Sequence, residues 1–529
     1  MKETSEVAAL GSILTEIEHV LIKFTGAPPD IVRSSITAPP GNSHAIYGTS
    51  IALRLRPDGG TEDLARQIAR HFNSETASQL TVASAIGPYV NFTASLGAVD
   101  ALSRDLMRGE RRAQGRILIE AHPPNIDSDF YVLHYRALAT SNYLYKLFSG
   151  QGFETHQLIF WNDCGLPAGR AILSRRQGSE IDYDPKAVLS PVDDSEASAL
   201  AASIEAGDQS VVDEWKSLRS EVLRRYLSQM RSFNFFYDRL ISESDQFQNL
   251  SELRTALLAR GLATVSSDGS IISSSSRSED DETILFRRDG TSLYLTRDLA
   301  ELLTRAEMPV ARNIYVVARN QAGHFRKLFE LAEGLGSPLA ELSEYASFGL
   351  SHPRGVTVLE ALEAITPLSP SWLSADPENP RIPAELALRI HVLLTKRTSD
   401  LMATDEVALK RALGQYLGML RACERSALSQ NRETRRASRT AKTLTDLNDA
   451  RLIRQIDGVD RAKITAGTRL DPSLYLKYAF ELARSLEAAT RTGSAFADGL
   501  EAPAVSIVRE ALSFMDVEVK LGNSREVEI

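Results

Sequence analysis

The sequence is poor in cysteine. Its two cysteines, Cys164 and Cys423, are too few for a disulfide framework or a structural zinc site. No apolar run approaches the length that a membrane-spanning helix needs. The N-terminal stretch carries acidic residues, among them Glu3, Glu6 and Glu16, whereas a secretory signal opens with basic ones. These absences predict a protein of the reducing cytoplasm.

An overall excess of positive charge is also absent. The chain has 60 Lys and Arg against 69 Asp and Glu, which gives a formal net charge of −9. This balance argues against a protein that is basic over its whole surface. It does not exclude a local basic patch, which is what phosphate binding requires. At 529 residues, the chain is long enough for two to four domains with ample core.

The stretch from Arg116 to Arg170 predicts a parallel β-sheet. Ile117–Glu120 is a short apolar run typical of a buried strand. His134–Ser149 carries apolar residues at helical spacing, and glycines follow it, as they commonly follow a helix. Thr155–Phe160 is typical of a second strand. One βαβ unit of this kind predicts an α/β fold with a doubly wound parallel sheet, in which ligands bind at the carboxyl ends of the strands.

The residues before this unit predict a small α/β domain over 1–110. Val7–Phe24 and Thr61–Phe72 have the apolar spacing of helices. Thr49–Leu55 and Tyr89–Ala94 are typical of strands.

The residues after it divide at about position 405. Residues 111–405 contain the βαβ unit and a serine-rich and acidic tract, 266–282, which has little to bury and should form a mobile loop. Such a loop is either inert or a phosphorylated regulatory segment. Residues 406–529 predict a helical domain, with strong helical periodicity in Val407–Leu428 and Leu474–Ala489.

A series of short motifs, in chain order, carries a resemblance to a known family. The motifs are Gly87-Pro88-Tyr89-Val90-Asn91-Phe92, Pro124-Asn125, Tyr294-Leu295-Thr296-Arg297-Asp298, Gln321-Ala322-Gly323-His324 and Lys396-Arg397-Thr398-Ser399-Asp400. This set resembles the arginyl-tRNA synthetases, which are class I aminoacyl-tRNA synthetases. The resemblance implies a Rossmann-like catalytic domain over 111–405, an N-terminal module that contacts the tRNA elbow (or is a leftover packing domain) over 1–110, and an α-helical anticodon-binding domain over 406–529.

The chain departs from the family at its two nucleotide signatures. Tyr131-Val132-Leu133-His134 stands where the HIGH signature is expected, and Ser128 replaces a loop lysine. Ser351–Val356 stands in place of the KMSKS-like loop and contains no lysine. Loss of one preorganised donor to a developing charge costs about 3–4 kcal/mol. We therefore expect the chain to lack ATP-dependent activation of arginine.

The family's arginine pocket is expected to be retained. By the resemblance, the guanidinium of arginine is held by Glu120, Tyr294 and Asp298, and the α-amino end by Asn125 and Gln321. A planar cation with five donors favours carboxylates and an aromatic face. Thr296 is expected to cap the helix that carries Asp298. Selective retention of this pocket is one interpretation, and uniform decay of an inactive paralogue is the other.

Two further groups of residues are candidates for function. Near the pocket, the groups that could move a proton are His134, Tyr131, His324 and Asp163, although a structural role is the ordinary one for any single histidine. In the helical region, a basic run that is either a solvated helix face or a tRNA phosphate contact contains Arg432, Arg435, Arg436, Arg439 and Lys442.

An arginine site without ATP chemistry resembles the fungal arginine-containing cyclodipeptide synthases. That resemblance implies an ATP-independent aminoacyltransferase, which joins arginyl-tRNA and a second aminoacyl-tRNA into a cyclo(Arg-Xaa) diketopiperazine. The alternatives are a non-catalytic paralogue that binds arginine or tRNA as a regulator, and an arginine–tRNA ligase with an altered ATP site. No metal and no cofactor are expected, and tRNA(Arg) is the expected partner of a monomer. The second amino acid, the general base and any covalent aminoacyl-enzyme are left open.

Overall fold

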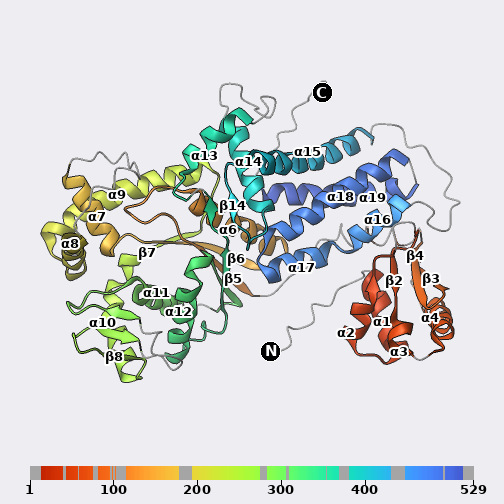
Figure 1. The fold of residues 1–529 in the computed structure, drawn as a ribbon, viewed down its shortest axis with the longest axis horizontal. Coiled ribbons are helices and arrows are strands. Elements are labelled where there is room, and N and C mark those ends of the chain that lie inside the picture. Colours follow the sequence, from red (N-terminus) through yellow and green to blue (C-terminus); the bar gives the residue numbers. More distant parts are fainter. Residues whose placement is uncertain are drawn as a thin grey trace.

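The computed structural model describes residues 13–39, 43–57, 59–75, 81–95, 98, 102, 115–177, 194–273, 283–305, 309–352, 354–368, 381–429, 447–492 and 495–515. In Figure 1 the N-terminal elements form a separate unit beside the C-terminal helices, and the central sheet lies on the other side of those helices. Among the described residues, no helix combines the length and the apolar character needed to cross a membrane.

The N-terminal unit is a four-stranded antiparallel sheet packed against helices. Its strand order is β1-β2-β4-β3. Its elements are α1 (Ile13–Thr25), α2 (Pro29–Ser35), β1 (Ile36–Thr37), β2 (Tyr47–Thr49), α3 (Ile51–Leu55), α4 (Thr61–Glu75), β3 (Thr81–Ile86) and β4 (Tyr89–Ala94).

One strand predicted in this unit is mostly a helix. Only Tyr47–Thr49 is extended, and Ile51–Leu55 forms α3. The hydroxyl of Thr49 accepts a hydrogen bond from the Ile51 N–H, and the Ser50 carbonyl accepts from Leu53, which turns the chain into a helix. An apolar run this short is ambiguous, because both strand and helix can bury its side chains.

The central sheet has five parallel strands in the order β12-β11-β5-β6-β7. The strands are β5 (Arg116–Ala121), β6 (Glu154–Trp161), β7 (Arg239–Ser242), β11 (Arg312–Ala318) and β12 (Ser343–Phe348). Helix α6 (Val132–Gly150) connects β5 to β6, and α12 (Ala322–Gly334) connects β11 to β12. The predicted βαβ unit and the doubly wound parallel sheet are confirmed.

Two sets of elements lie between these strands. Between β6 and β7 are α7 (Gly165–Arg176), α8 (Asp194–Ala206) and α9 (Gln209–Ser232). Between β7 and β11 are the 3-10 helix η2 (Glu243–Asn249), α10 (Leu250–Ala259), β8 (Ala263–Val265), β9 (Ile271–Ser273), β10 (Ile284–Phe286) and α11 (Tyr294–Arg305).

The predicted mobile loop 266–282 is ordered over its first half. Ser266–Ser270 forms a turn in which Asp268 accepts hydrogen bonds from Ser270, and β9 follows it. Ile271 is buried, so this part of the tract has an apolar anchor that its serine-rich composition concealed. Residues 274–282 lie outside the described residues.

The remaining described residues form helices, their connections and two short strands. Its elements are η4 (Arg319–Gln321), β13 (Ser351–His352), α13 (Val358–Ile365), η5 (Thr366–Leu368), α14 (Arg381–Leu394), β14 (Leu401–Met402), α15 (Glu406–Ser429), α16 (Leu447–Asp457), α17 (Val459–Arg469), α18 (Pro472–Thr492) and α19 (Ala495–Phe514). The described residues after position 405 are helices and their connections, as predicted.

A buried carboxylate joins the two ends of the chain. Asp457, the last residue of α16, accepts hydrogen bonds from the N–H groups of Ile13 (2.7 Å) and Leu14 (3.2 Å) and from the hydroxyl of Tyr47 (2.7 Å). The N–H groups of a first helical turn have no partner within their own helix. The C-terminal helices therefore supply a cap to α1.

Candidate functional site

The candidate site lies where the order of the sheet reverses. From β5 the chain continues outward to β6 and β7, and it then returns to the other side of β5 to form β11 and β12. The carboxyl ends of β5 and β11 are therefore neighbours, and ligands of doubly wound sheets bind in the crevice at such a point. His122 follows β5, and η4 follows β11.

Glu120, near the end of β5, is paired with an arginine of the chain itself. Its Oε2 accepts a hydrogen bond from Arg305, whose guanidinium also bonds to Glu301 and lies 5.4 Å from the ring centre of Tyr315. Glu120 and Arg305 are almost fully buried. Glu120, predicted to receive the guanidinium of arginine, thus holds a buried internal guanidinium.

In the described structure, one of the two carboxylate oxygens of Asp298 has no internal partner. His324 Nε2 donates to Asp298 Oδ2 at 2.5 Å, and the ring of Tyr294 lies 4.8 Å from the His324 ring. Asp298 Oδ1 is buried and, within the described part of the chain, has no hydrogen-bond partner. Tyr294 is 55% exposed, so one aromatic face of this trio borders solvent. The predicted trio of Tyr294, Asp298 and His324 is therefore brought together.

The expected cap of the helix that carries Asp298 is wrong. Thr296 lies inside α11 and not before it, and its hydroxyl donates to the Leu285 carbonyl at 2.6 Å. Its role is to tie α11 to β10, because Leu285 lies in that strand.

A second buried pair adjoins Asp298. Arg297 Nε lies 2.9 Å from Glu243 Oε1, and Cys164 donates to Glu243 Oε2 at 3.5 Å. Burial raises the pKa of Glu243 to about 7, and burial followed by the charge of Asp298 raises the pKa of Glu301 well above its usual range. We call Glu120, Glu243, Asp298 and Glu301, with Arg297 and Arg305, the carboxylate cluster. It holds four carboxyl groups against two guanidinium groups.

His134, in the first turn of α6, takes part in the cap of that helix. Its Nδ1 accepts a hydrogen bond from the Tyr131 N–H at 3.1 Å, so a neutral ring carries its proton on Nε2. Burial, and then the charge of His122, lowers the pKa of His134 to about 4. Burial also lowers the pKa of His122, whose Nε2 lies 3.0 Å from Glu120 Oε1. His134 is therefore a neutral structural acceptor at physiological pH.

Tyr131 and Asp163 are the other two predicted proton carriers. Burial, followed by the charge of Asp129, raises the pKa of Tyr131. Asp163 is fully buried and accepts from Arg219 (2.5 Å) and from the Ser244 N–H (2.9 Å) and hydroxyl (2.7 Å). Both of its oxygens are engaged, which gives Asp163 a structural role between β6 and η2.

The two residues predicted to hold the α-amino group are exposed at the edge of the sheet. Asn125 lies in the loop after β5, and its carbonyl accepts from Tyr226 (2.7 Å). The side chain of Gln321 accepts from the Ala318 N–H at 3.3 Å at the end of β11. They thus stand at the ends of the two neighbouring strands, on either side of the reversal.

The two nucleotide signature positions are hydrogen-bonded to each other. We call Phe130–His134 the signature segment. The Val132 N–H donates to the Val356 carbonyl (3.1 Å), and the Val358 N–H donates to the Phe130 carbonyl (2.9 Å). Leu133 is partly buried against the main core. Val356–Val358, which follow the last strand of the central sheet, therefore lie directly against the start of α6.

Several members of the carboxylate cluster were not predicted. Arg305 and Glu301 are four residues apart on α11, among buried leucines, so charged residues on the apolar face of a helix were the available signal. Arg297 belongs to the matched motif that contains Tyr294 and Asp298, but neither Arg297 nor Glu243 carries a chemical pattern of its own. The predicted basic run, Arg432, Arg435, Arg436, Arg439 and Lys442, lies outside the described residues.

Comparisons with known proteins agree with this geometry. A sequence model of the family described as tRNA synthetases class I (R), catalytic domain, matches residues 176–355. The structure is similar to the arginyl-tRNA synthetases of Thermus thermophilus (TM-score 0.68, 18% identity, 95% of this chain and 97% of that one) and Plasmodium falciparum (TM-score 0.71, 16% identity, 95% and 96%). The chain has the class I synthetase fold. In sequence it is similar to arginine–tRNA ligases of Streptococcus equi (24% identity, 91% of each chain) and Streptococcus pyogenes (24%, 83% of this chain and 84% of the other).

These comparisons correct the predicted activity of this synthetase-like chain. The expectation of an ATP-independent cyclodipeptide synthase that consumes two aminoacyl-tRNAs is wrong, because the relatives over nearly the whole chain are arginine–tRNA ligases by name. The expectation rested on the departures at the two signatures together with an arginine pocket that was expected to be retained. Substitutions at a few signature positions do not define the activity when the similarity to arginine–tRNA ligases extends over 91% of both chains.

Proposed function

We propose that the protein acts on arginine and tRNA(Arg) as an arginine–tRNA ligase with an altered nucleotide site. The observation that carries the proposal is the similarity to such ligases over 91% of both chains. In this proposal the sequence divides as predicted, into 1–110, 111–405 and 406–529. The basic run at Arg432–Lys442 contacts tRNA phosphates, and the protein works in the cytoplasm.

The unpartnered oxygen of Asp298 supports a cationic substrate. Asp298 Oδ1 is buried and has no hydrogen-bond partner in the described structure, and the rings of Tyr294 and His324 lie beside this carboxylate. A buried carboxylate oxygen without a donor is unfavourable, and a bound guanidinium supplies that donor. The guanidinium would lie against Asp298 and the rings of Tyr294 and His324, while Asn125 and Gln321 receive the α-amino end.

The test is arginine-dependent exchange of pyrophosphate into ATP, followed by charging of a tRNA(Arg) transcript. A ligase gives both reactions with arginine and neither with lysine, whose point charge cannot form a bidentate pair with a carboxylate. Lysine-supported exchange at a similar rate would contradict the assignment of the substrate. Absence of exchange and of charging, with arginine still bound, would favour the second candidate.

The second candidate is a paralogue that binds arginine or tRNA without ligase chemistry. It is favoured by the residues at the positions of the family's nucleotide signatures. Leu133 and Ser128 stand at such positions, and Ser351–Val356 has no lysine. A Leu133→Gly variant separates the two candidates, because it removes the side chain at the position where the family has glycine. In a ligase with an altered site it should lower the ATP concentration needed for half-maximal exchange, and Leu133→Ala should have a smaller effect. In a binding paralogue neither variant gives exchange.

A further inference from the structure

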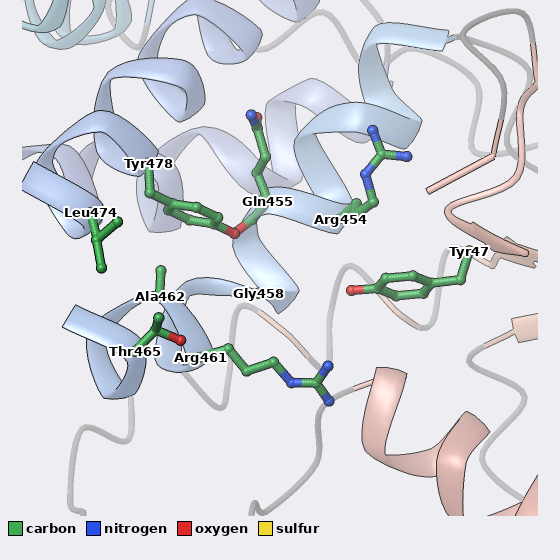
Figure 2. A pocket seen from close by; sticks show the side chains of 9 residues that line it. All are labelled: Tyr47, Arg454, Gln455, Gly458, Arg461, Ala462, Thr465, Leu474 and Tyr478. Carbon is green, nitrogen blue, oxygen red and sulfur yellow. The ribbon is translucent and has the colours of Figure 1, made fainter. Parts of the chain in front are cut away.

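A pocket lies between the N-terminal unit and the C-terminal helices, far along the chain from the carboxylate cluster. Its volume is about 470 Å³, within the range of small-molecule sites. It is lined by Tyr47 of β2 and by residues of α16–α18 and their connection: Arg454, Gln455, Gly458, Arg461, Ala462, Thr465, Leu474 and Tyr478. Figure 2 shows the Tyr47 ring projecting from the N-terminal unit toward the helices.

Two guanidinium groups face this space. In Figure 2 those of Arg454 and Arg461 lie on either side of the Tyr47 hydroxyl. Arg461 donates to Glu18 at 2.9 Å through one nitrogen and keeps further N–H groups, because a guanidinium has five. Arg454 donates to the Ile46 carbonyl at 3.4 Å and, among the described residues, forms no ion pair with a carboxylate.

Within the described ranges, no carboxylate forms an ion pair with Arg454. Burial lowers the pKa of Arg454, and the neighbouring Arg451 lowers it further. Two acidic groups that bond to residues lining the pocket have other partners: Asp457 bonds to α1 and Tyr47, and Glu18 is shared by Arg461 and Arg33. A partly buried cation in this state is stabilised by an anion that enters the pocket.

The remaining walls are aromatic and apolar. The ring of Tyr478 lines the pocket, and its hydroxyl is fixed by a hydrogen bond to the Gln455 carbonyl. A side chain at Gly458 would meet the Tyr478 hydroxyl at 2.7 Å, so glycine permits this packing. Aromatic faces beside arginines are the surfaces on which proteins hold unstacked nucleotides.

We propose that this pocket binds one nucleotide unit, with its phosphate on Arg454 and Arg461 and its base or sugar against Tyr47 and Tyr478. The unit is either a free mononucleotide or a nucleotide of an RNA chain. Either ligand would bridge the N-terminal unit to the C-terminal helices. This inference goes beyond the proposed function, because it requires neither arginine nor ATP.

The test measures binding of cytidine monophosphate by equilibrium dialysis and of a tRNA(Arg) transcript by filter binding, both without arginine. Arg454→Gln removes the unpaired cation, and Thr465→Trp fills the pocket without changing its charge. Arg451→Gln is the matched control, since it removes the same charge from an exposed position on the same helix. Thermal unfolding of each variant identifies any that fails to fold.

We expect Arg454→Gln and Thr465→Trp to weaken binding at least about tenfold, equivalent to one charge-assisted hydrogen bond. Arg451→Gln should stay within about twofold under the same salt, since one exposed charge contributes little. Weakening of cytidine monophosphate assigns a free nucleotide, and weakening of the transcript alone assigns an RNA nucleotide. The proposal is overturned if the wild type binds neither probe, if both pocket variants bind like the wild type, or if Arg451→Gln weakens binding as much as Arg454→Gln.

Discussion

The two sides of the crevice at β5 and β11 differ in the forces that hold them together. The carboxylate cluster is built from buried charges that depend on one another, with Arg305 between Glu120 and Glu301. The signature segment instead has an apolar side chain at Leu133 and backbone hydrogen bonds to Val356 and Val358. Buried charges tolerate few replacements, because removal of one partner leaves the other uncompensated. Backbone bonds place little constraint on the side chains. The two sides therefore place different constraints on their residue types: strict ones on the charged side and loose ones on the signature segment.

The largest effect on stability should come from removing a charged residue of the carboxylate cluster. Arg305→Met leaves Glu120 and Glu301 buried without their shared partner and should lower the free energy of unfolding by about 3–5 kcal/mol. Urea unfolding followed by circular dichroism measures this loss. Arg66→Met, which removes an exposed arginine beside Asp63, is the control and should leave the midpoint unchanged.

A second variant tests whether the loss in Arg305→Met is electrostatic. Adding Glu120→Gln to Arg305→Met removes one uncompensated charge, so the double variant should recover part of the lost stability. If the double variant is as unstable as the sum of the single ones, the two side chains are not coupled and the description of the cluster is wrong.

The signature side should respond to acid. The pKa of His134 is about 4 in the folded protein and near 6.5 when the chain is unfolded, so the unfolded chain gains a proton first as the pH falls. Stability should therefore be lost between about pH 6.5 and pH 4, by up to about 3 kcal/mol. His134→Gln keeps a hydrogen-bond acceptor without a titrating group, and its stability should depend less on pH over this range. His122, whose pKa is also lowered, supplies the part of the slope that remains. An identical slope in the two proteins would show that His134 does not titrate in this way.

Substrate affinity should depend on Asp298. Asp298→Asn removes the charge beside the unpartnered Oδ1, and arginine should bind roughly ten- to a hundredfold more weakly, equivalent to about 1.5–3 kcal/mol. Titration calorimetry with arginine measures this change. Asp213→Asn, on the exposed surface of α9, is the control for a lost aspartate. Unchanged affinity in Asp298→Asn would remove this residue from the arginine site.

The smallest effect should come from the backbone bond between the two signature positions. Val358→Pro removes the N–H that donates to Phe130, at the first position of α13, where proline fits a helix. Val358→Ala loses side-chain packing but keeps the N–H. The proline variant should be less stable than the alanine variant by about 1 kcal/mol in urea unfolding, the ordinary contribution of one hydrogen bond. Equal stabilities would mean that the bond contributes nothing.

The sequence was sufficient for the sheet but not for the pairing within the site. The apolar run Ile117–Glu120 and the helical spacing after it determine β5 and α6 locally, so both could be predicted from the order of the residues. The partner of Glu120 could not, because Arg305 is 185 residues away and reaches it only through the return of the chain to form β11. For the same reason, Asp163 could not be recognised as structural before Arg219 and Ser244 were placed beside it. The activity was mispredicted because signature residues were given more weight than the whole chain.

The cap that Asp457 provides to α1 has a consequence for synthesis on the ribosome. The residue that completes the first helical turn is translated 444 residues after Ile13. At about 5–20 residues per second, the helix waits roughly 20 to 90 seconds for this partner. The N-terminal unit is thus made first yet finished last, and a chain that terminates before position 457 would leave its opening helix frayed.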